Sequence, residues 1–409
     1  MHLLIIGAGI GGLSTALMLA EQGIRCSVLE QAPEIREVGV GINILPHAVK
    51  HLARLGLLGE LEANAIPTGT LILANRFGQE VWREVRGAKA GYDVPQFSIH
   101  RGRLQKILLD AVRERLGDVV RVDHRLTGFV QADGAATALF ETAKGPVTLQ
   151  ADGLIGADGI HSVVRKGLFP DQGPPLWSGV MMWRGARDWP KFLDGNSMTI
   201  LGGRREKLVV YPIAPGTTED TRLTNWVINI GIAAPGSPLP QNEDWSREGA
   251  RQALLKRIDR FSSPLLDVRG LLESTPQFWE HPMCDRDALP FWSKDRVTLL
   301  GDAAHPMYPM GSNGAGQAIL DAACLSRELG ARKTVIDAFK AYEAERLPLT
   351  AEVVRRNRLG GPEMVIDRVE ELAPEGFDDI EALLPYPERL RLSNEYAETA
   401  GFSQARVNA

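Results

Sequence analysis

Cysteine is scarce in this chain: Cys26, Cys284 and Cys324 are the three cysteines among 409 residues, and no two have C-x-x-C spacing. We therefore expect no disulfide framework, no structural zinc or other metal site and no dithiol redox chemistry. A run of 18 apolar residues is also missing, so the sequence predicts no membrane span. Positive charge is not in excess, since 46 Lys and Arg face 51 Asp and Glu, and the net charge of −5 argues against nucleic acid or an anionic membrane as the main partner.

Low-complexity tracts and internal repeats are absent too, and the 44% hydrophobic and 24% charged residues are typical of a globular protein. A length of 409 residues predicts two or three units with a sizeable core. Residues 1–20 are apolar, but four glycines interrupt them and no Lys or Arg precedes them. We interpret this stretch as part of the mature fold rather than as an export signal, and we expect a cytoplasmic protein.

The N-terminus carries a strand–turn–helix–strand pattern. A short apolar run leads into Gly7, Gly9 and Gly12, which have G-x-G-x-x-G spacing; apolar residues then recur at helical spacing, and a second short strand ends at Glu30. Glycines at these positions let backbone N–H groups approach a pyrophosphate, and the helix N-terminus favours its charge. Glu30 would hold a ribose hydroxyl pair and repel the extra phosphate of NADP. The pattern predicts a bound adenine dinucleotide without deciding between FAD and NAD.

Two further strand–turn–helix segments follow later in the chain. One leads from an apolar strand into Asp158 and Gly159, a pair that also suits a simple β-turn. The other brings a buried strand to Asp302, passes through a loop rich in proline and glycine, and starts a helix near Gly314 that continues through Leu329. An aspartate at a strand end can accept a bond from a ribitol hydroxyl, and a helix N-terminus can stabilise negative charge on a reduced flavin ring. These features favour FAD.

The three motifs, G-x-G-x-x-G with its acid, D-G and G-D-A-A-H-P, resemble the three-part signature of the single-component (group A) flavin-dependent aromatic monooxygenases, which share the p-hydroxybenzoate hydroxylase fold. The likeness runs from residue 1 to about 355 and is highly specific. Within the family the chain is most similar to 5-methylphenazine-1-carboxylate monooxygenases and, more loosely, to salicylate and 6-hydroxynicotinate hydroxylases. The closer likeness is carried by short matches at 39–44, 182–185, 211–213, 225–227, 285–290 and 307–315.

The resemblance implies roles for individual residues in holding FAD. Arg101 would contact the phosphate and ribitol region, and Asp302 the ribitol or the pyrophosphate. Pro309 would lie beside the C4a edge of the flavin, while the N–H groups of Gly314 and Ala315 would meet the pyrimidine. The D-G pair is tied in this family to the nicotinamide nucleotide as well, and NADH or NADPH is implied as a transient cosubstrate because no second G-x-G-x-x-G is present. The full implied FAD set is Gly7, Gly9, Gly12, Glu30, Gly41, Arg101, Asp158, Gly159, Asp302, Pro309, Gly314 and Ala315.

Two positions depart from the family pattern. Relatives carry Gly-x-Asn after the pyrimidine loop, whereas this chain has glycine at Gly316, so an asparagine side-chain contact is lost there. Hydroxylases of phenolic acids often have a histidine four residues before a tyrosine on the substrate side, and here Lys207 precedes Tyr211 by four. A histidine general base at this point is therefore not supported, and the identity of any base stays open.

Between the second and third motifs the pattern changes to short strands separated by Gly or Pro turns. We expect strands at 179–185, 197–201, 207–211 and 223–230. The predicted fold is α/β: a Rossmann-like FAD-binding domain with an inserted antiparallel β-sheet, an α+β layer that faces the flavin edge and forms the substrate site. The expected units are a discontinuous FAD-binding domain (1–75, 97–178 and 281–355), a substrate-binding sheet domain (76–96 and 179–280), and a C-terminal helical segment with a loosely ordered tail (356–409).

Aromatic residues in this region are candidates for substrate contact. Residues alternate between the two faces of a strand, so Tyr211 shares a face of its strand with Lys207, and Trp183 lies on another strand of the same sheet. Either side chain is also explained by core packing alone. With the resemblance, Trp183, Tyr211 and Tyr308 are the candidate substrate-binding residues. The candidate catalytic positions are Tyr211 and Pro309, and Arg184 is either a carboxylate anchor or part of a structural salt bridge.

The implied function is NAD(P)H- and FAD-dependent hydroxylation of an aromatic or N-heteroaromatic ring of phenazine, pyridine or salicylate type. NAD(P)H would reduce FAD, O₂ would add at the flavin C4a, and the hydroperoxide would attack an activated ring carbon, with loss of CO₂ where that carbon bears a carboxylate. An NAD-dependent dehydrogenase leaves the second and third motifs unexplained, and the G-W-x-W-x-I-P motif of flavin-dependent halogenases is absent. Another FAD-dependent oxidase or dehydrogenase, or a flavin-binding protein without turnover, stays open, as do the ring itself and a homodimer.

Overall fold

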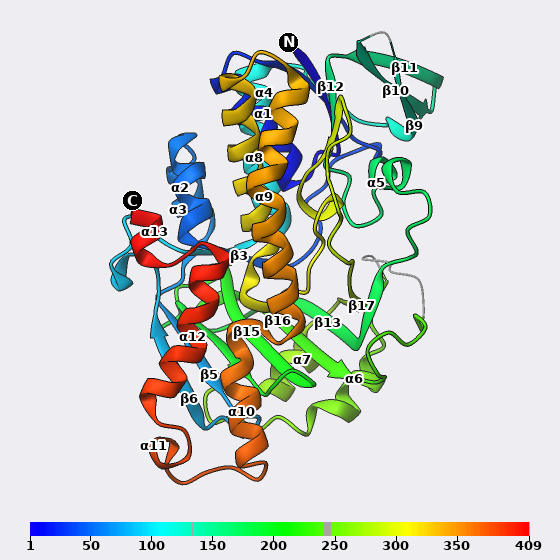
Figure 1. Ribbon diagram of the computed structural model, residues 1–409. Coiled ribbons are helices and arrows are strands. Elements are labelled where there is room, and N and C mark those ends of the chain that lie inside the picture. The colour runs from blue at the N-terminus through cyan, green and yellow to red at the C-terminus, as the bar shows by residue number, and fades with distance from the viewer. Residues whose placement is uncertain (133, 241–246, 409) are drawn as a thin grey trace.

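The computed structural model describes residues 1–132, 134–240 and 247–408 (Figure 1). One part of the molecule is built on a five-stranded sheet in which every pairing is parallel. The sheet is nearly continuous apolar sequence, since each of its first two strands in the chain has four buried residues, as expected for strands covered on both faces. In spatial order the strands are β18 (Val297–Leu299), β12 (Gly153–Gly156), β1 (His2–Ile6), β2 (Arg25–Leu29) and β8 (Val120–Arg121).

Helices complete the core around this sheet. α1 (Ile10–Glu21) packs against both α4 (Arg101–Leu116) and α8 (Gly314–Ala331), and α8 also packs against α9 (Val335–Arg358), which lies alongside it in Figure 1. The strand–helix–strand start of the chain and the helix from Gly314 are therefore confirmed. Shorter helices are α2 (Pro46–Arg54), α3 (Leu58–Asn64) and α5 (Val163–Leu168).

Two small antiparallel sheets lie beside this domain and were not predicted from the sequence. One has the order β11-β10-β9, from β9 (Arg125–Ala132), β10 (Ala135–Thr142) and β11 (Gly145–Ala151). The other has the order β3-β7-β4, from β3 (Gly41–Ile44), β4 (Ile66–Pro67) and β7 (Phe97–His100).

The second large element is a seven-stranded sheet that contains all four strands expected between the second and third motifs. Its pairings are antiparallel except for β14 with β5. Three strands extend past the expected boundaries of the sheet domain: β5 precedes residue 76, β13 begins at residue 176, and β17 continues beyond residue 280. In spatial order the strands are β17 (Phe278–Asp285), β13 (Leu176–Pro190), β16 (Thr221–Gly231), β15 (Glu206–Pro215), β14 (Ser197–Leu201), β5 (Thr70–Ala74) and β6 (Glu80–Val85).

The two faces of this sheet bury different clusters, as period-two alternation requires. The outer face presents residues such as Leu208 and Trp226 to α6 (Arg251–Ile258) and α7 (Val268–Ser274). The inner face presents residues such as Met198 and Tyr211 to the C-terminal part of the chain. Among the described residues, no helix combines the length and the apolar composition that crossing a bilayer requires.

The C-terminal residues differ from the loosely ordered tail that was expected. They form η4 (Gly361–Glu363), α10 (Met364–Leu372), α11 (Ile380–Leu383), α12 (Tyr386–Ala400) and α13 (Gln404–Asn408). In Figure 1, α10 and α12 lie beside the sheet, whereas α13 lies near α2. Val365, Ile366 and Val369 of α10 are fully buried against the inner face. This helical spacing of apolar residues gives the segment a face to bury, so it packs as part of the fold.

Candidate active site

The three motifs meet at one edge of the parallel sheet. β1, β12 and β18 are adjacent strands, and each motif follows the carboxyl end of one of them. Because parallel strands end at the same edge, the turn after Ile6 and the side chains of Asp158 and Asp302 gather there. Gly7, Asp158 and Asp302 thus lie at one edge of the sheet, although about 150 residues of sequence separate each from the next.

The glycine turn between β1 and α1 has two tightly packed members and one open member. A Cβ on Gly7, whose φ is 103°, would lie 2.5 Å from the oxygen of Ala157, and one on Gly12 would lie 2.0 Å from the oxygen of Gly7. At Gly9 a Cβ would meet no atom within 4 Å. Gly9 also begins α1 without a side-chain cap, and the first turn contains no acidic residue. The exposed N–H groups of this turn therefore form a cradle suited to an anion.

Glu30 lies at the end of β2, beside this turn, as the sequence placed it. One carboxylate oxygen accepts a bond from the N–H of Ala8 (2.9 Å) and the other from the N–H of Ala32 (2.9 Å). Gln105 from α4 donates to the oxygen of Ala8 (2.7 Å). These bonds fix the direction of the Glu30 carboxylate, and its further lone pairs are the acceptors that a ribose hydroxyl pair needs.

The second motif uses its aspartate to cap a helix. Asp158 accepts bonds from the hydroxyl of Ser162 (2.5 Å) and from the N–H groups of Val163 (2.7 Å) and Val164 (3.2 Å) at the start of α5. Burial raises the pKa of the Asp158 carboxyl, although these hydrogen bonds act in the opposite direction. Gly159, at φ 78°, completes the turn and has no atom within 4 Å of its Cβ position.

Arg165 joins the second motif to the third, a link that the sequence analysis did not assign. Its guanidinium donates to the carbonyl oxygens of Ala303 (3.0 Å) and Ala304 (2.8 Å), and its Nε donates to Gln172 (2.6 Å). Burial and the neighbouring Arg286 lower its pKa to about 10. The only sequence signal was an arginine in the first helical turns after D-G, which is too common a pattern to assign a partner.

The third motif places Asp302 at the carboxyl end of β18. Its side chain is exposed, yet surrounding protein raises the pKa of its carboxyl, with His305 and Arg101 acting in the opposite direction. The preceding strand is anchored by Tyr342, whose hydroxyl donates to the oxygen of Leu299 (3.0 Å).

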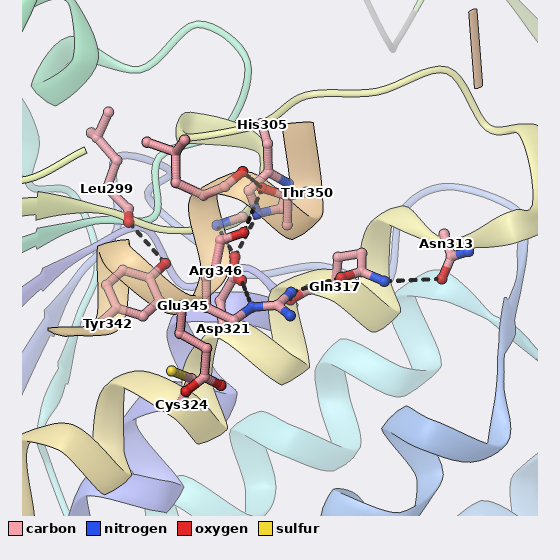
Figure 2. A network of polar contacts seen from close by, with 12 residues as sticks. Leu299, His305, Asn313, Gln317, Asp321, Cys324, Tyr342, Glu345, Arg346 and Thr350 are labelled. Atoms are coloured by element: carbon pink, nitrogen blue, oxygen red, sulfur yellow. Dashed lines mark hydrogen bonds and ion pairs between the residues drawn. The ribbon is translucent and has the colours of Figure 1, made fainter. Parts of the chain in front are cut away.

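A buried polar network supports this loop from beneath (Figure 2). Asp321 of α8 accepts bonds from the N–H of Gly301 (3.1 Å), from Nε2 of His305 (2.5 Å) and from Nε of Arg346 (2.7 Å). Arg346 also donates to Oε1 of Gln317 (2.6 Å). Burial alone would raise the pKa of Asp321, but His305 and Arg346 outweigh it and lower the pKa to about 2. His305 is therefore a structural residue that holds the loop of Asp302 to α8.

Cys324, Glu328 and Glu345 also lie near this network, with ligand atoms within 4.8 Å of one another. Arg327 forms ion pairs with Glu328 (2.9 Å) and Glu345 (2.5 Å), and Arg332 with Glu328 (2.8 Å). These guanidinium groups supply the positive charge that a cation would otherwise bring, so we assign no metal to this group.

The loop after the third motif holds a strained backbone in front of α8. Gly311 and Ser312 both have left-handed backbone angles, with φ 65° and 56°. For a serine this conformation costs on the order of 1–3 kcal/mol, which the surroundings must offset. Pro309 is exposed, and α8 begins at Gly314 with no side-chain cap and no acidic residue in its first turn. A second helix N-terminus suited to negative charge is thus presented beside Pro309.

The loop before β3 and β3 itself connect α4 to the seven-stranded sheet. Arg101 is the exposed first residue of α4, and its N–H donates to the oxygen of Val40 (2.8 Å). Gly41 donates its N–H to Oδ1 of Asn225 on the seven-stranded sheet (2.8 Å). A Cβ on Gly41 would lie 2.7 Å from atoms of Asn225 and Ile213, so glycine is required for β3 to approach the sheet this closely.

Tyr211 and Trp183 lie on opposite faces of the seven-stranded sheet. Tyr211 is on the inner face and 5% exposed, and burial raises its pKa. Trp183 is in the outer cluster with Trp226, and its indole donates to Glu280 (3.0 Å). The two residues cannot contact one ligand, because the thickness of the sheet separates them. We therefore assign Trp183 to the core of the outer face.

Tyr308 packs against the inner face of β13. Its ring is in a buried cluster with Met182 and Met310, and its hydroxyl bonds to Asp285. Arg358 holds that carboxylate through Nε (2.6 Å) and Nη2 (3.0 Å). Burial raises the pKa of Tyr308, so its hydroxyl stays protonated and is oriented by Asp285.

The inner face also carries polar groups that suit a polar ligand. Arg184 reaches the loop before β3, where its Nη2 and the Cδ of Arg101 come within 3.8 and 3.6 Å of the Cβ position of Gly39. Burial, and then Arg101, lower the pKa of Arg184 to about 10. Within the described residues, Nδ2 of Asn225 and Oδ1 of Asn229 are buried without a hydrogen-bond partner. Buried polar atoms without a protein partner are rare and suggest a partner that the chain itself does not provide.

Lys207, in the place of the family histidine, lies on the inner face with Tyr211, but protein partners hold its ammonium group. It is 3% exposed and forms a buried ion pair with Glu363 of η4, and its Nζ also lies 2.9 Å from the sulfur of Met310. A lysine with these partners ties the sheet to the C-terminal segment.

A cavity of about 450 Å³ lies next to the second motif. It is rich in basic side chains, and some of its walls are apolar. Its lining includes His161, Ser162, Arg165, Lys166, Pro174 and Arg286.

Proteins of similar sequence include several named as aromatic hydroxylases or monooxygenases, and some similar solved structures contain FAD. Residues 1–357 match the family described as FAD binding domain. Phenazine 1,6-dicarboxylic acid hydroxylase PhzS from Lysobacter antibioticus is 44% identical over 363 residues, which cover 87% of this chain and 89% of that protein. The 3-hydroxybenzoate 6-hydroxylase 1 of Aquipseudomonas alcaligenes is 32% identical, with coverages of 87% and 88%.

Two solved structures share the fold at low sequence identity. HpxO of Klebsiella pneumoniae, complexed with FAD and uric acid, has a TM-score of 0.77 at 22% identity, covering 98% of this chain and 96% of its own. A salicylate hydroxylase substrate complex has a TM-score of 0.76 at 22% identity, covering 100% and 98%. At this identity the likeness shows a common fold and nothing finer.

Proposed function

The chain belongs to the FAD binding domain family, and we propose that it hydroxylates a carboxylated N-heteroaromatic ring of the phenazine type. It is an FAD-dependent aromatic hydroxylase with the p-hydroxybenzoate hydroxylase fold, and NAD(P)H and O₂ are its cosubstrates. The ring and its carboxylate are the proposed part. They are supported by the 44% identity to a phenazine 1,6-dicarboxylic acid hydroxylase over most of both chains.

The residues at the edge of the parallel sheet fit FAD. The open cradle at Gly9 suits the pyrophosphate, and the fixed carboxylate of Glu30 suits the adenosine ribose. Asp302 is proposed to bind the ribitol region with Arg101 nearby, because both side chains are exposed and Arg101 is close enough to act on the pKa of Asp302. Pro309 and the N-terminus of α8 at Gly314 and Ala315 are proposed to face the flavin ring. The remaining members of the proposed set, Gly7, Gly12, Gly41, Asp158 and Gly159, shape the backbone around it.

The basic cavity beside the second motif is proposed to receive the phosphates of NAD(P)H. The cavity adjoins α5. Arg165 lines it and also donates to the backbone of the third motif, so a coenzyme bound there would lie near the proposed flavin site. Positive side chains are well suited to a pyrophosphate. Whether NADH or NADPH is preferred is decided by direct comparison of the two coenzymes.

The inner face of the sheet is proposed to bind the ring. Arg184 supplies a half-buried positive charge for the carboxylate, Tyr211 lies on the same face near it, and the Nδ2 of Asn225 offers a further donor. Bound FAD would, once reduced, supply the activation of O₂, so that substrate, O₂, NAD(P)H and a proton would give hydroxylated product, NAD(P)⁺ and water. The protein orients the ring carbon and excludes water around it. Tyr308 closes the wall of this space beside Pro309.

The decisive observation is the positive charge of Arg184 on the inner face, and its test compares carboxylated and uncharged rings. We expect phenazine carboxylates to stimulate NAD(P)H oxidation more than pyridine, quinoline or benzoate carboxylates, with a product heavier by one oxygen. Arg184→Met should raise KM for the acid by at least about tenfold, since it removes a charge-assisted bond, and change KM for the methyl ester little. Arg187→Met, on the exposed opposite face of β13, is the matched control and should behave as wild type.

Other results would point elsewhere. Equal NAD(P)H oxidation with every ring, accompanied only by H₂O₂, would favour a plain FAD-dependent oxidase. An equal rise in KM for acid and ester in Arg184→Met would give this arginine a structural role instead. A cytoplasmic location and a homodimer are further proposals from the sequence, and gel filtration of the holoenzyme tests the second.

A further inference from the structure

The backbone of the loop from Tyr308 to Asn313, which carries Pro309, is contacted by three residues from the last 53 positions of the chain. Asn357 at the end of α9 donates from Nδ2 to the oxygen of Tyr308 (2.9 Å). Glu363 in η4 accepts from the N–H of Gly311 (3.4 Å). We call Asn357, Glu363 and Tyr396 the C-terminal clamp, because each of the three contacts the backbone of this loop.

Tyr396 of α12 is the hub of the clamp. Its hydroxyl donates to Oδ1 of Asn357 (2.7 Å), lies 3.1 Å from the oxygen of Met310 and accepts from Nδ2 of Asn313 (3.2 Å). Its ring lies directly on Gly311, where a Cβ would be 2.5 Å from the ring carbon Cε1. The side chain is 2% exposed, so these bonds are made without competition from water.

The clamp acts on a backbone that does not hold its own shape. Gly311 and Ser312 are both left-handed, and within the loop the N–H of Ser312 donates to the oxygen of Pro309 (3.2 Å). A conformation of this kind persists only where surrounding groups fix it. The clamp does so with buried side chains, while Pro309 stays exposed and Gly314 and Ala315 stay partly exposed.

We propose that Tyr396 is a positioning residue of the flavin site: through the clamp it sets the place of Pro309 and of the N-terminus of α8 against the flavin ring. The inference rests on the proposed function in taking this loop as the flavin-facing one. It also gives the C-terminal segment a role that the three sequence motifs do not suggest. The ion pair of Lys207 with Glu363 extends the clamp to the inner face of the sheet, so the ring-binding face and the loop share one support.

The test replaces the Tyr396 hydroxyl and keeps its ring. Tyr396→Phe should weaken FAD binding by about fivefold to tenfold, the loss expected for about one buried hydrogen bond that holds the loop. At saturating FAD, the visible absorption bands of the bound flavin should shift or lose fine structure. The amount of H₂O₂ formed per NAD(P)H oxidised should rise about twofold or more, because loss of one such bond misplaces the loop. Tyr386→Phe is the matched control, because Tyr386 begins the same helix but is 51% exposed and away from the loop.

A second variant covers the case in which Tyr396→Phe does not fold. Asn357→Leu removes the bond to the oxygen of Tyr308 with little change in volume and should show the same FAD and peroxide effects. FAD affinity and spectra do not depend on which ring is the substrate, so they separate this inference from the substrate proposal. Unchanged FAD binding, spectrum and peroxide yield in Tyr396→Phe would overturn the positioning role. Loss of folded protein in both variants would also overturn it, since the clamp would then be needed for folding alone.

Discussion

Replacing Asp321 by asparagine should destabilise the protein severely at neutral pH. The substitution keeps the shape of the side chain but removes a charge that is completely buried and accepts three hydrogen bonds. Arg346 would then be a buried cation, 4% exposed, without the carboxylate that it now contacts at 2.7 Å. Removing one partner of a buried ion pair costs about 3–5 kcal/mol, and we expect a loss of that size in the free energy of unfolding.

The pH dependence of this loss follows from the pKa of Asp321. Its pKa falls from 3.8 to about 2 on folding because His305 and Arg346 outweigh burial, and this corresponds to about 2–3 kcal/mol of stability. A lowered pKa contributes stability that is fully present above the unfolded value. The contribution diminishes as pH falls below about 4 and is lost near pH 2. Wild type and Asp321→Asn should therefore differ by a constant amount from pH 8 to 5 and by about 1 kcal/mol less at pH 3.

Urea unfolding of the apoprotein, followed by circular dichroism at several pH values, measures this difference directly. Asp110→Asn is the control, because that carboxylate is exposed and pairs with Lys106 on the surface of α4, where we expect a change of less than about 1 kcal/mol. A variant within about 1 kcal/mol of wild type at pH 7, or a gap that does not change between pH 8 and pH 3, would refute the reasoning. The first result would mean that Arg346 finds another partner, and the second that Asp321 titrates normally.

Three further predictions concern the cofactor and the ring. Gly9→Ala should fold normally but bind FAD at least about tenfold more weakly, because its Cβ enters only the open cradle, whereas Gly12→Ala should fail in thermal melts since its Cβ would lie 2.0 Å from a backbone oxygen. Asp302→Ala should be purified mostly without FAD, and full occupancy by visible absorbance after gel filtration would contradict the proposed ribitol contact. Tyr211→Phe should keep FAD and NAD(P)H oxidation but yield less hydroxylated product per NAD(P)H, with more H₂O₂. Trp183→Phe, on the opposite face of the sheet, should leave this ratio unchanged, and equal effects in both variants would return Tyr211 to a packing role.

Elements that are determined by a few neighbouring residues could be predicted from the sequence. The strand–turn–helix at the N-terminus, the helix from Gly314 and the four strands between the second and third motifs were predicted because turns, apolar periodicity and glycine spacing act over a few residues. The cofactor could be inferred from motifs that each place a glycine turn or an acid at the end of a strand. The sequence could not show that Tyr211 and Trp183 lie on opposite faces of the sheet. Alternation fixes the faces within a strand, but which face of each strand looks inward depends on pairing with distant strands.

The amino-acid sequence by itself determined which segments form the parallel sheet and its glycine turn, because strand apolarity and turn chemistry are encoded within short windows. Only the tertiary structure decided what supports the site. Arg165 reaches carbonyl oxygens 138 and 139 residues away, and Tyr396 reaches the loop at Met310 across 86 residues. No local pattern distinguishes an arginine or tyrosine that will make such bonds from one that stays on the surface. The C-terminal segment reads as polar and irregular in sequence, and it becomes part of the site only because the apolar face of α10 has the inner face of the sheet to pack against.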